Sequence, residues 1–158
     1  MTQELRPGEV ATGHSLRADA ALAFIGVIRT PWARREDCPK QGSRAGPACR
    51  LVLDPPWDAA LVGVEDYPVI EVLYWLHRSR RDLVLQRPAQ AEGPRGTFAL
   101  RSPIRPNPIG TALVRLERRE GATLVVRGAR LPRRDAARRH QARALRLLAG
   151  GRLRPPLA

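Results

Sequence analysis

Residues 111–127 read TALVRLERREGATLVVR and give the clearest structural signal in the chain. Apolar and polar side chains alternate over residues 111–117 and again over residues 123–127, the period-two pattern of a half-buried strand. Glu120-Gly121 lies between the two runs and is suited to a tight turn, so the stretch predicts a β-hairpin. Antiparallel β structure is therefore the starting hypothesis for the fold.

Four segments upstream of this hairpin also have the composition of strands. They are residues 24–30, which end before Pro31, and residues 50–53, 69–77 and 97–101. About six strands with few helices predict a mainly β fold, a single small domain closed into a β-barrel, because closure removes exposed sheet edges. Trp57, Tyr74 and Trp75 are expected in its core. No G-x-G-x-x-G sequence follows a strand, which argues against a Rossmann nucleotide site.

The chain has 158 residues and a formal net charge of +13, which is unevenly distributed. Residues 129–158 hold nine Arg and one Asp, whereas residues 1–128 hold 19 Lys and Arg against 14 Asp and Glu. The body is thus moderately basic, which suits nucleic acid without requiring it. We expect a flexible extension over residues 1–22, the barrel over residues 23–128, and an atypical basic tail over residues 129–158 with a helix at 135–148.

Composition also sets expectations for compartment and metal content. No apolar run approaches the ~18 residues that a membrane-spanning helix needs. The N-terminus lacks the apolar core of a secretory signal. Cys38 and Cys49 are too few for a disulfide scaffold or a zinc site. We therefore expect a cytoplasmic protein with no metal and no membrane association.

Residues 96–110 read GTFALRSPIRPNPIG and carry the strongest functional signal. Prolines at 103, 106 and 108 each fix their own φ and favour extended geometry in the preceding residue, so the loop is stiff. Arg101, Arg105 and Asn107 would be held at fixed angles by it. Preorganised polar groups of this kind suit a charged ligand, but a rigid barrel corner with solvated arginines explains the pattern equally well.

The same segment resembles the signature of the TsaA-like family, also called TrmO, YaeB or VirR-like, whose pattern is roughly G-x-F-x-x-R-S-P-x-R-P-N-P-I-G. Other segments agree in order. Residues 38–42, CPKQG, resemble the family's C-P-R-Q-G loop with Lys40 in place of Arg, and residues 61–65 and 72–77 resemble its L-x-G-L-E and strand-to-His elements. The resemblance covers about residues 23–128.

The resemblance implies a β-barrel that binds S-adenosylmethionine, acts on tRNA as a homodimer, and methylates N6 of threonylcarbamoyladenosine at position 37. Matching motifs position by position implies cofactor contacts at Pro39, Lys40, Gln41, His77, Arg78, Arg101 and Thr111, where Thr111 replaces the family's Leu or Met. The catalytic group is unknown, with Asn107 and Arg105 as candidates. Methyl transfer would then depend mainly on positioning, because no carboxylate–His pair offers a base.

The tail departs from the family, which continues with an Asp-Gly-Thr-Pro segment that contributes to the cofactor pocket. Residues 129–143 can be back-translated so that the next reading frame encodes LDCLDGTPLVDIKP, so we hypothesise that residues 129–158 are frameshifted relative to the family. Three functions stay open: the tRNA methyltransferase, a non-catalytic RNA-binding barrel or damaged family member, and a related barrel that acts on another small acceptor.

Overall fold

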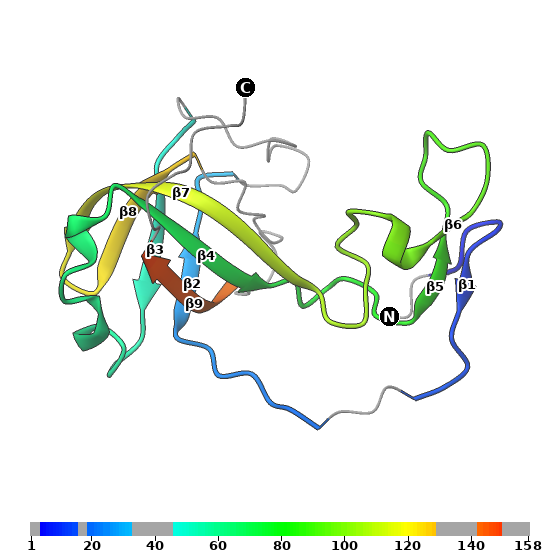
Figure 1. Ribbon diagram of the computed structural model, residues 1–158, viewed down its shortest axis with the longest axis horizontal. Coiled ribbons are helices and arrows are strands. Elements are labelled where there is room, and N and C mark those ends of the chain that lie inside the picture. Colours follow the sequence, from blue (N-terminus) through cyan, green and yellow to red (C-terminus); the bar gives the residue numbers. More distant parts are fainter. Residues whose placement is uncertain (1–3, 16–18, 33–45, 129–141, 150–158) are drawn as a thin grey trace. The chain divides into compact units, whose positions relative to one another are not determined.

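The structure, a computed structural model, describes residues 4–15, 19–32, 46–128 and, as backbone, 142–149 (Figure 1). The chain divides into two compact units. We call residues 1–21 and 76–109 the three-stranded unit, and residues 22–75 and 110–158 the barrel unit. Each unit is described by itself.

Six antiparallel strands close into a barrel in the order β2-β3-β8-β7-β4-β9. Their bounds are β2 (Gly26–Arg29), β3 (Cys49–Leu53), β4 (Val69–Trp75), β7 (Ile109–Glu120), β8 (Thr123–Arg127) and β9 (Ala142–Ala149). The strand and hairpin predictions for β2, β3, β4, β7 and β8 are confirmed, with small differences at the ends. The mainly β barrel expected from the sequence is therefore the observed fold.

Alternation along the strands fills the barrel with apolar side chains. On β3 every second residue is buried, from Cys49 through Leu51 to Leu53, and on β4 the buried positions are Ile70, Val72 and Tyr74. Residues 124–126 of β8 are all buried, on both faces of the strand. Tyr74 thus lies in the core as expected.

The turn between β7 and β8 has the geometry that its sequence predicts. Glu120 pairs with Thr123, which leaves a loop of two residues, Gly121 and Ala122. Gly121 has φ +60°, and positive φ at the first loop position is the pattern of a type II′ hairpin turn. This turn twists in the same sense as the strands that it joins.

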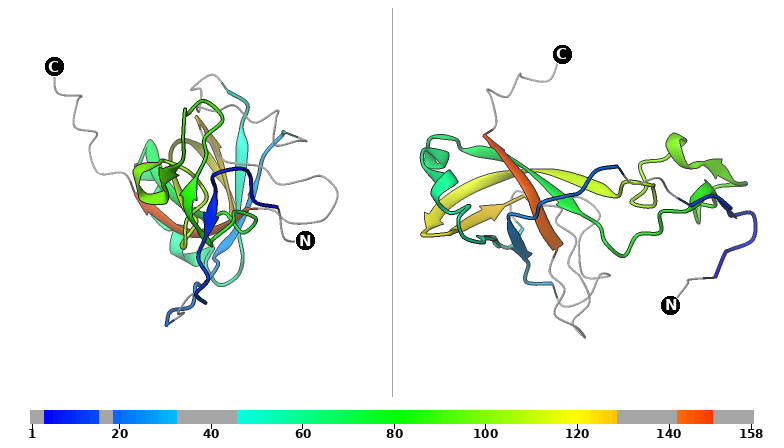
Figure 2. Two further views of the ribbon diagram at one scale, coloured as in Figure 1. Left: turned by 90° about the vertical axis from the view of Figure 1, so that its right-hand side faces the viewer. Right: turned by 90° about the horizontal axis from the view of Figure 1, so that it is seen from below.

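The last strand, β9, corrects the expectation of a helix in the tail. A helix was expected over residues 135–148, yet residues 142–149 pair with both β2 and β4, and residues 135–141 lie outside the described part. β9, drawn in orange in Figure 2, pairs antiparallel with β4 from Ile70 to Trp75. The helix propensity of Ala, Arg and Leu is a weak preference, and the open edges of β2 and β4 outweigh it. The tail thus supplies the strand that closes the barrel.

Two short 3-10 helices connect β3 to β4 in the barrel unit. They are η1 (Ala59–Leu61) and η2 (Val64–Asp66), and Pro55–Pro56 before them is a cis peptide. Leu61 is buried and anchors this connection. Trp57, expected in the core, is 42% exposed, because it lies in the turn before η1 rather than on a strand. Trp75 ends β4 and is half-buried.

The three-stranded unit is a sheet in the order β1-β5-β6, with β1 (Val10–Ala11), β5 (Leu83–Gln86) and β6 (Arg95–Gly96). β1 pairs antiparallel with β5, so this part of the extension that was expected to be flexible belongs to a sheet. The strand predicted at 97–101 is wrong: residues Thr97–Ala99 form the 3-10 helix η3. The side-chain hydrogen bonds of Thr97, described below, favour the turn over an extended strand.

Candidate functional site

Two buried polar side chains fix the segment that was singled out from the sequence. Gln86 at the end of β5 is 4% exposed and Thr97 at the start of η3 is 6% exposed. The Gln86 Nε2 group donates to Thr97 Oγ1 at 2.9 Å and to the carbonyl oxygen of Ile104 at 2.8 Å. The Thr97 hydroxyl donates to the carbonyl oxygen of Leu83 at 2.7 Å. All donors of both side-chain groups are used, so the network ties the loop firmly to β5.

Backbone carbonyls of the proline-rich loop make further contacts within the same unit. Arg81 Nε donates to the carbonyl oxygen of Pro106 at 2.6 Å. The amide of Leu76 donates to the carbonyl oxygen of Pro108 at 2.8 Å, and Pro108 itself is fully buried. The stiffness expected from three prolines is thus reinforced by hydrogen bonds at two of them.

A hollow of about 290 Å³ lies between this loop, the end of β5 and the N-terminal segment. It is lined by Arg6, Gln86, Arg87, Pro88, Ala89, Leu100, Arg101, Ser102 and Ile104. Three arginines and no acidic residue therefore line one small space, and the guanidinium of one of them, Arg6, is paired with Glu9. Guanidinium groups bind carboxylates and phosphates through paired, charge-assisted hydrogen bonds, so the hollow suits a small anionic group.

Arg6 lines the hollow because a tight turn leads the N-terminal segment onto β5. The amide of Glu9 donates to the carbonyl oxygen of Arg6 at 2.9 Å, and Gly8 between them has φ +82°. Pro7 in the second position and a positive-φ Gly8 in the third are the pattern of a type II turn. The Glu9 carboxylate also accepts from the Arg6 amide at 3.1 Å and from its guanidinium at 2.8 Å.

Two carboxylates of this unit are held ionised by their neighbours. The Arg6 backbone amide, followed by the Arg6 guanidinium, lowers the pKa of Glu9 below its ordinary value. The Arg80 guanidinium, which donates to Asp82 at 2.9 and 2.6 Å, lowers the pKa of Asp82, and the same bonds raise the pKa of Arg80. The Arg6–Glu9 and Arg80–Asp82 ion pairs therefore stabilise the unit while their carboxylates are ionised.

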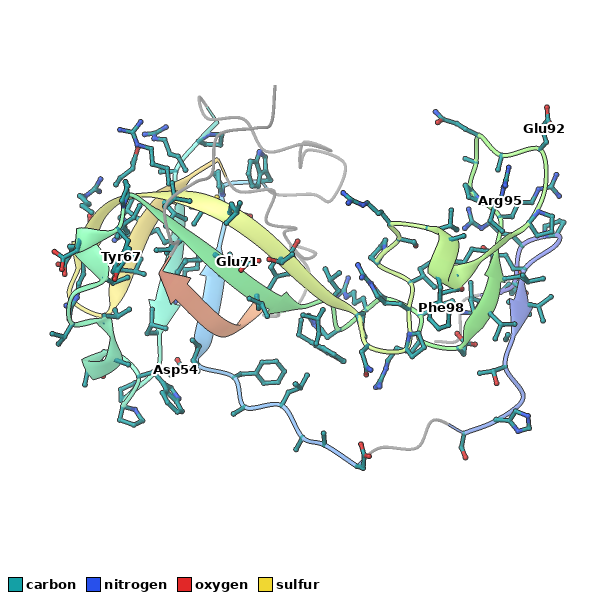
Figure 3. All side chains as sticks on the ribbon, viewed as in Figure 1. Asp54, Tyr67, Glu71, Glu92, Arg95 and Phe98 are labelled. Atoms are coloured by element: carbon teal, nitrogen blue, oxygen red, sulfur yellow. The ribbon has the colours of Figure 1, made fainter. Side chains whose placement is uncertain are left out.

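The structure places the predicted site residues in different parts of the chain. Arg101 is exposed and lines the hollow. Exposed side chains at the start and end of the same unit, namely His77, Arg78, Arg105 and Asn107, do not line it. Thr111 lies on β7 of the barrel, where its hydroxyl donates to Glu71 of β4, labelled in Figure 3. Pro39, Lys40 and Gln41 lie outside the described residues.

Sequence reasoning missed most of the hollow. Arg87 and Gln86 follow a short apolar run, residues 83–85, that was not taken as a strand. Arg6 was assigned to the extension, although Pro7-Gly8 is a turn signal that predicts a fixed position for its neighbours. Reading Arg6-Pro7-Gly8-Glu9 as a turn would have placed Arg6 before a strand.

The described part of the chain lacks both a membrane-spanning helix and a cluster of metal-binding side chains. It contains no helix with the length and apolar character to cross a membrane. Within the same residues, no three His, Cys, Asp or Glu side chains come together as a metal-binding group. Cys49 on β3 is buried, and its thiol donates to the carbonyl oxygen of Pro47.

Comparison with known proteins gives consistent matches. The family model for the tRNA-methyltransferase O N-terminal domain matches residues 27–133. A relative from Rhizobium radiobacter, named probable S-adenosyl-L-methionine-binding protein VirR, is 53% identical over 124 residues, which covers 78% of this chain and 71% of the relative.

Solved structures agree with this match. A crystal structure of TrmO from Pseudomonas aeruginosa superposes with a TM-score of 0.64 at 27% identity and covers 89% of this chain and 60% of that one. A second crystal structure of TrmO gives a TM-score of 0.68 at 28% identity, with 89% and 62% covered. This chain therefore spans about three-fifths of the length of these solved chains.

Proposed function

The chain belongs to the tRNA-methyltransferase O family, and from this premise we propose that it transfers a methyl group from S-adenosylmethionine to tRNA. The proposed acceptor is N6 of threonylcarbamoyladenosine at position 37. The observation that carries the proposal is the loop with the sequence RSPIRPNP, which is pinned by the Gln86–Thr97 network and presents Arg101 at a hollow lined by arginines.

The described residues fit one end of the cofactor. The Arg101 guanidinium has no ion pair within the described ranges, and a guanidinium is the group that best matches a carboxylate. Arg101 would therefore hold the carboxylate of the methionine part. When bound, S-adenosylmethionine supplies an electrophilic methyl group.

The remaining contacts are proposed from the family match. They are Pro39, Lys40, Gln41, His77, Arg78 and Thr111. Thr111 is committed to Glu71 through its hydroxyl, so its contact to a cofactor would use its methyl group or require that hydrogen bond to open. Lys40 replaces the family's Arg with a group that binds anions as a point charge.

The chain's own contribution to the reaction is proposed to be positioning. An adenine N6 must approach the methyl carbon to about 3–3.5 Å on the line opposite sulfur. The Arg105 guanidinium offers hydrogen-bond donors and no acceptor atom, so it serves to bind the substrate rather than to remove the N6 proton. The Asn107 side-chain oxygen can accept a hydrogen bond from N6–H and so orient it. Both residues lie on the loop that the prolines and the Gln86–Thr97 network hold rigid.

We also propose that the active form is a cytoplasmic homodimer, as the family resemblance implies. Size-exclusion chromatography with light scattering gives the mass in solution: a value near twice 17.5 kDa supports the dimer and a value near 17.5 kDa contradicts it.

The direct test incubates the chain with methyl-labelled S-adenosylmethionine and a tRNA that carries threonylcarbamoyladenosine at position 37. The matched control is the same tRNA without the threonylcarbamoyl group. We expect label in the first tRNA alone, at N6 by mass spectrometry of the nucleosides. RNA binding without product would favour a non-catalytic RNA-binding barrel, and cofactor binding without methylation of either tRNA would favour another acceptor.

A further inference from the structure

The most exposed large apolar side chain in the three-stranded unit is Phe98 on η3, labelled in Figure 3. It is 90% exposed, although its neighbour Thr97 is 6% exposed and fully hydrogen-bonded. The three-residue helix ends with the amide of Leu100 donating to the carbonyl oxygen of Thr97. The hydrogen bonds of Thr97 and Leu100 thus fix the backbone around Phe98, and the Phe98 ring extends into solvent.

A fixed, exposed aromatic ring indicates a binding contact, because exposed apolar surface favours contact with a partner. Phe has only two side-chain torsions, and its backbone is already ordered, so little conformational freedom is lost when the ring binds. The support consists of Gln86 and Thr97, whose network also holds the proline-rich loop through the Ile104 carbonyl oxygen. The arrangement is that of a preorganised contact residue.

The charges around Phe98 indicate what kind of partner it fits. Residues 76–109 hold seven Arg against two acidic residues, Asp82 and Glu92. Asp82 is paired with Arg80, whereas Arg95, Arg101 and Arg105 have no ion pair within the described part of the chain. In the barrel, arginines 50, 118, 119 and 127 pair with glutamates, whereas Arg29 and Arg115 have no ion pair among the described residues. The segment that carries Phe98 therefore holds positive charge that no carboxylate of the described residues compensates.

We propose that Phe98 is a stacking platform for an unpaired base of the RNA substrate, with Arg95 bound to a neighbouring phosphate. This inference rests on the proposed function for the identity of the RNA. Aromatic rings that stack on bases beside arginines that contact phosphates are the general means by which proteins bind single-stranded nucleic acid. Phe98 lies three residues from Arg95, a span of at most about 10 Å of chain, so one short RNA segment can reach both.

A second copy of this chain is a less suitable occupant. If two copies met at their Phe98 rings, the same uncompensated arginines would face each other. Repulsion between like charges opposes that contact, whereas a polyanion is attracted to it. The RNA assignment therefore accounts for both the ring and the charge.

The test measures binding of a fluorescently labelled anticodon stem-loop to the full chain and to Phe98→Ala, Phe98→Leu and Phe98→Trp. We expect Phe98→Ala and Phe98→Leu to weaken binding by about 5- to 150-fold and Phe98→Trp to retain it, because stacking needs an aromatic face. The matched control is Val62→Ala, which removes an 83% exposed apolar side chain from the barrel unit and leaves affinity unchanged. Equal thermal unfolding of all variants shows that the fold is intact.

A salt series separates stacking from charge. Phe98→Ala leaves the slope of log affinity against log salt unchanged, whereas Arg95→Ala reduces its magnitude by about 0.7–0.9. An affinity that does not respond to Phe98→Ala, or a wild-type chain that does not bind the stem-loop, overturns the inference. A Phe98 variant that changes the mass of the protein in solution but not its RNA affinity also overturns the inference, since Phe98 would then contact a second copy of the chain.

The outcomes also separate this inference from the proposed function. RNA binding that depends on Phe98, in a chain that transfers no methyl group, supports the inference and contradicts the methyltransferase. Methyl transfer by a chain whose RNA affinity is independent of Phe98 supports the methyltransferase and contradicts the inference.

Discussion

Substituting Thr97 by Val removes one hydroxyl from the centre of the Gln86 network and preserves the shape of the side chain. Two hydrogen bonds are lost, one accepted from Gln86 Nε2 at 2.9 Å and one donated to the Leu83 carbonyl at 2.7 Å. Each is worth about 0.5–1.5 kcal/mol net, and the buried donor left on Gln86 adds about 1 kcal/mol. The opening free energy of this unit should therefore fall by about 2–4 kcal/mol.

Hydrogen exchange measured by mass spectrometry reads this effect locally. Peptides from residues 83–109 should lose about 30- to 1000-fold of their protection in Thr97→Val, since about 1.4 kcal/mol corresponds to a factor of ten. The control Thr97→Ser keeps the hydroxyl and should lose far less. Unchanged protection in Thr97→Val would refute the claim that this network fixes the loop and Phe98.

Two further predictions concern the barrel and the effect of pH. A Cβ on Gly26 would lie 2.2 Å from the Val52 carbonyl oxygen, so Gly26→Ala should lower the free energy of unfolding by about 3 kcal/mol or more in denaturant titrations, whereas Gly96→Ala, with open space around it, should be nearly neutral. An unaffected Gly26→Ala would argue against the β2–β3 pairing. The pKa values of Glu9 and Asp82 are lowered in the folded chain. The two ionised carboxylates therefore stabilise the fold at pH values above the ordinary carboxyl pKa, and this stabilisation is lost as the pH falls below about 4 through the lowered pKa values. The hydrogen-exchange protection of residues 82–87 should fall on acidification, and Asp82→Asn should make this protection less dependent on pH. Protection that stays constant down to pH 3 would contradict the prediction.

Five of the six barrel strands were predictable, because strand-forming residues gather in short runs between turn signals. In the structure β3 and β4 bury every second residue, and Gly121 marks the hairpin turn. β9 was not predictable, since its conformation is set by pairing with β2 and β4, which are far away in the chain. Local propensity alone favoured a helix there.

The site was predictable only in part. The proline-rich loop and Arg101 stood out by residue type and spacing, but the hollow also needs Arg6 and Arg87 from other segments. The exposure of Phe98 was not predictable either. An apolar residue in an extended-looking run is ordinarily buried, and the network of Gln86 and Thr97 that turns it outward joins residues 11 positions apart. The assignments of His77, Arg78 and Thr111 stay predictions, as do those of Pro39, Lys40 and Gln41.

The most direct test of the central claim is a calorimetric titration of S-adenosylmethionine into the full chain and into Arg101→Ala. Charge-assisted hydrogen bonds to a carboxylate are worth about 1.5–3 kcal/mol, so Arg101→Ala should weaken binding by about 10- to 150-fold. Arg115→Ala, which removes an exposed arginine from β7, is the matched control and should bind as the wild type does. A wild-type chain that does not bind the cofactor, or an Arg101→Ala variant that binds it equally well, would contradict the account.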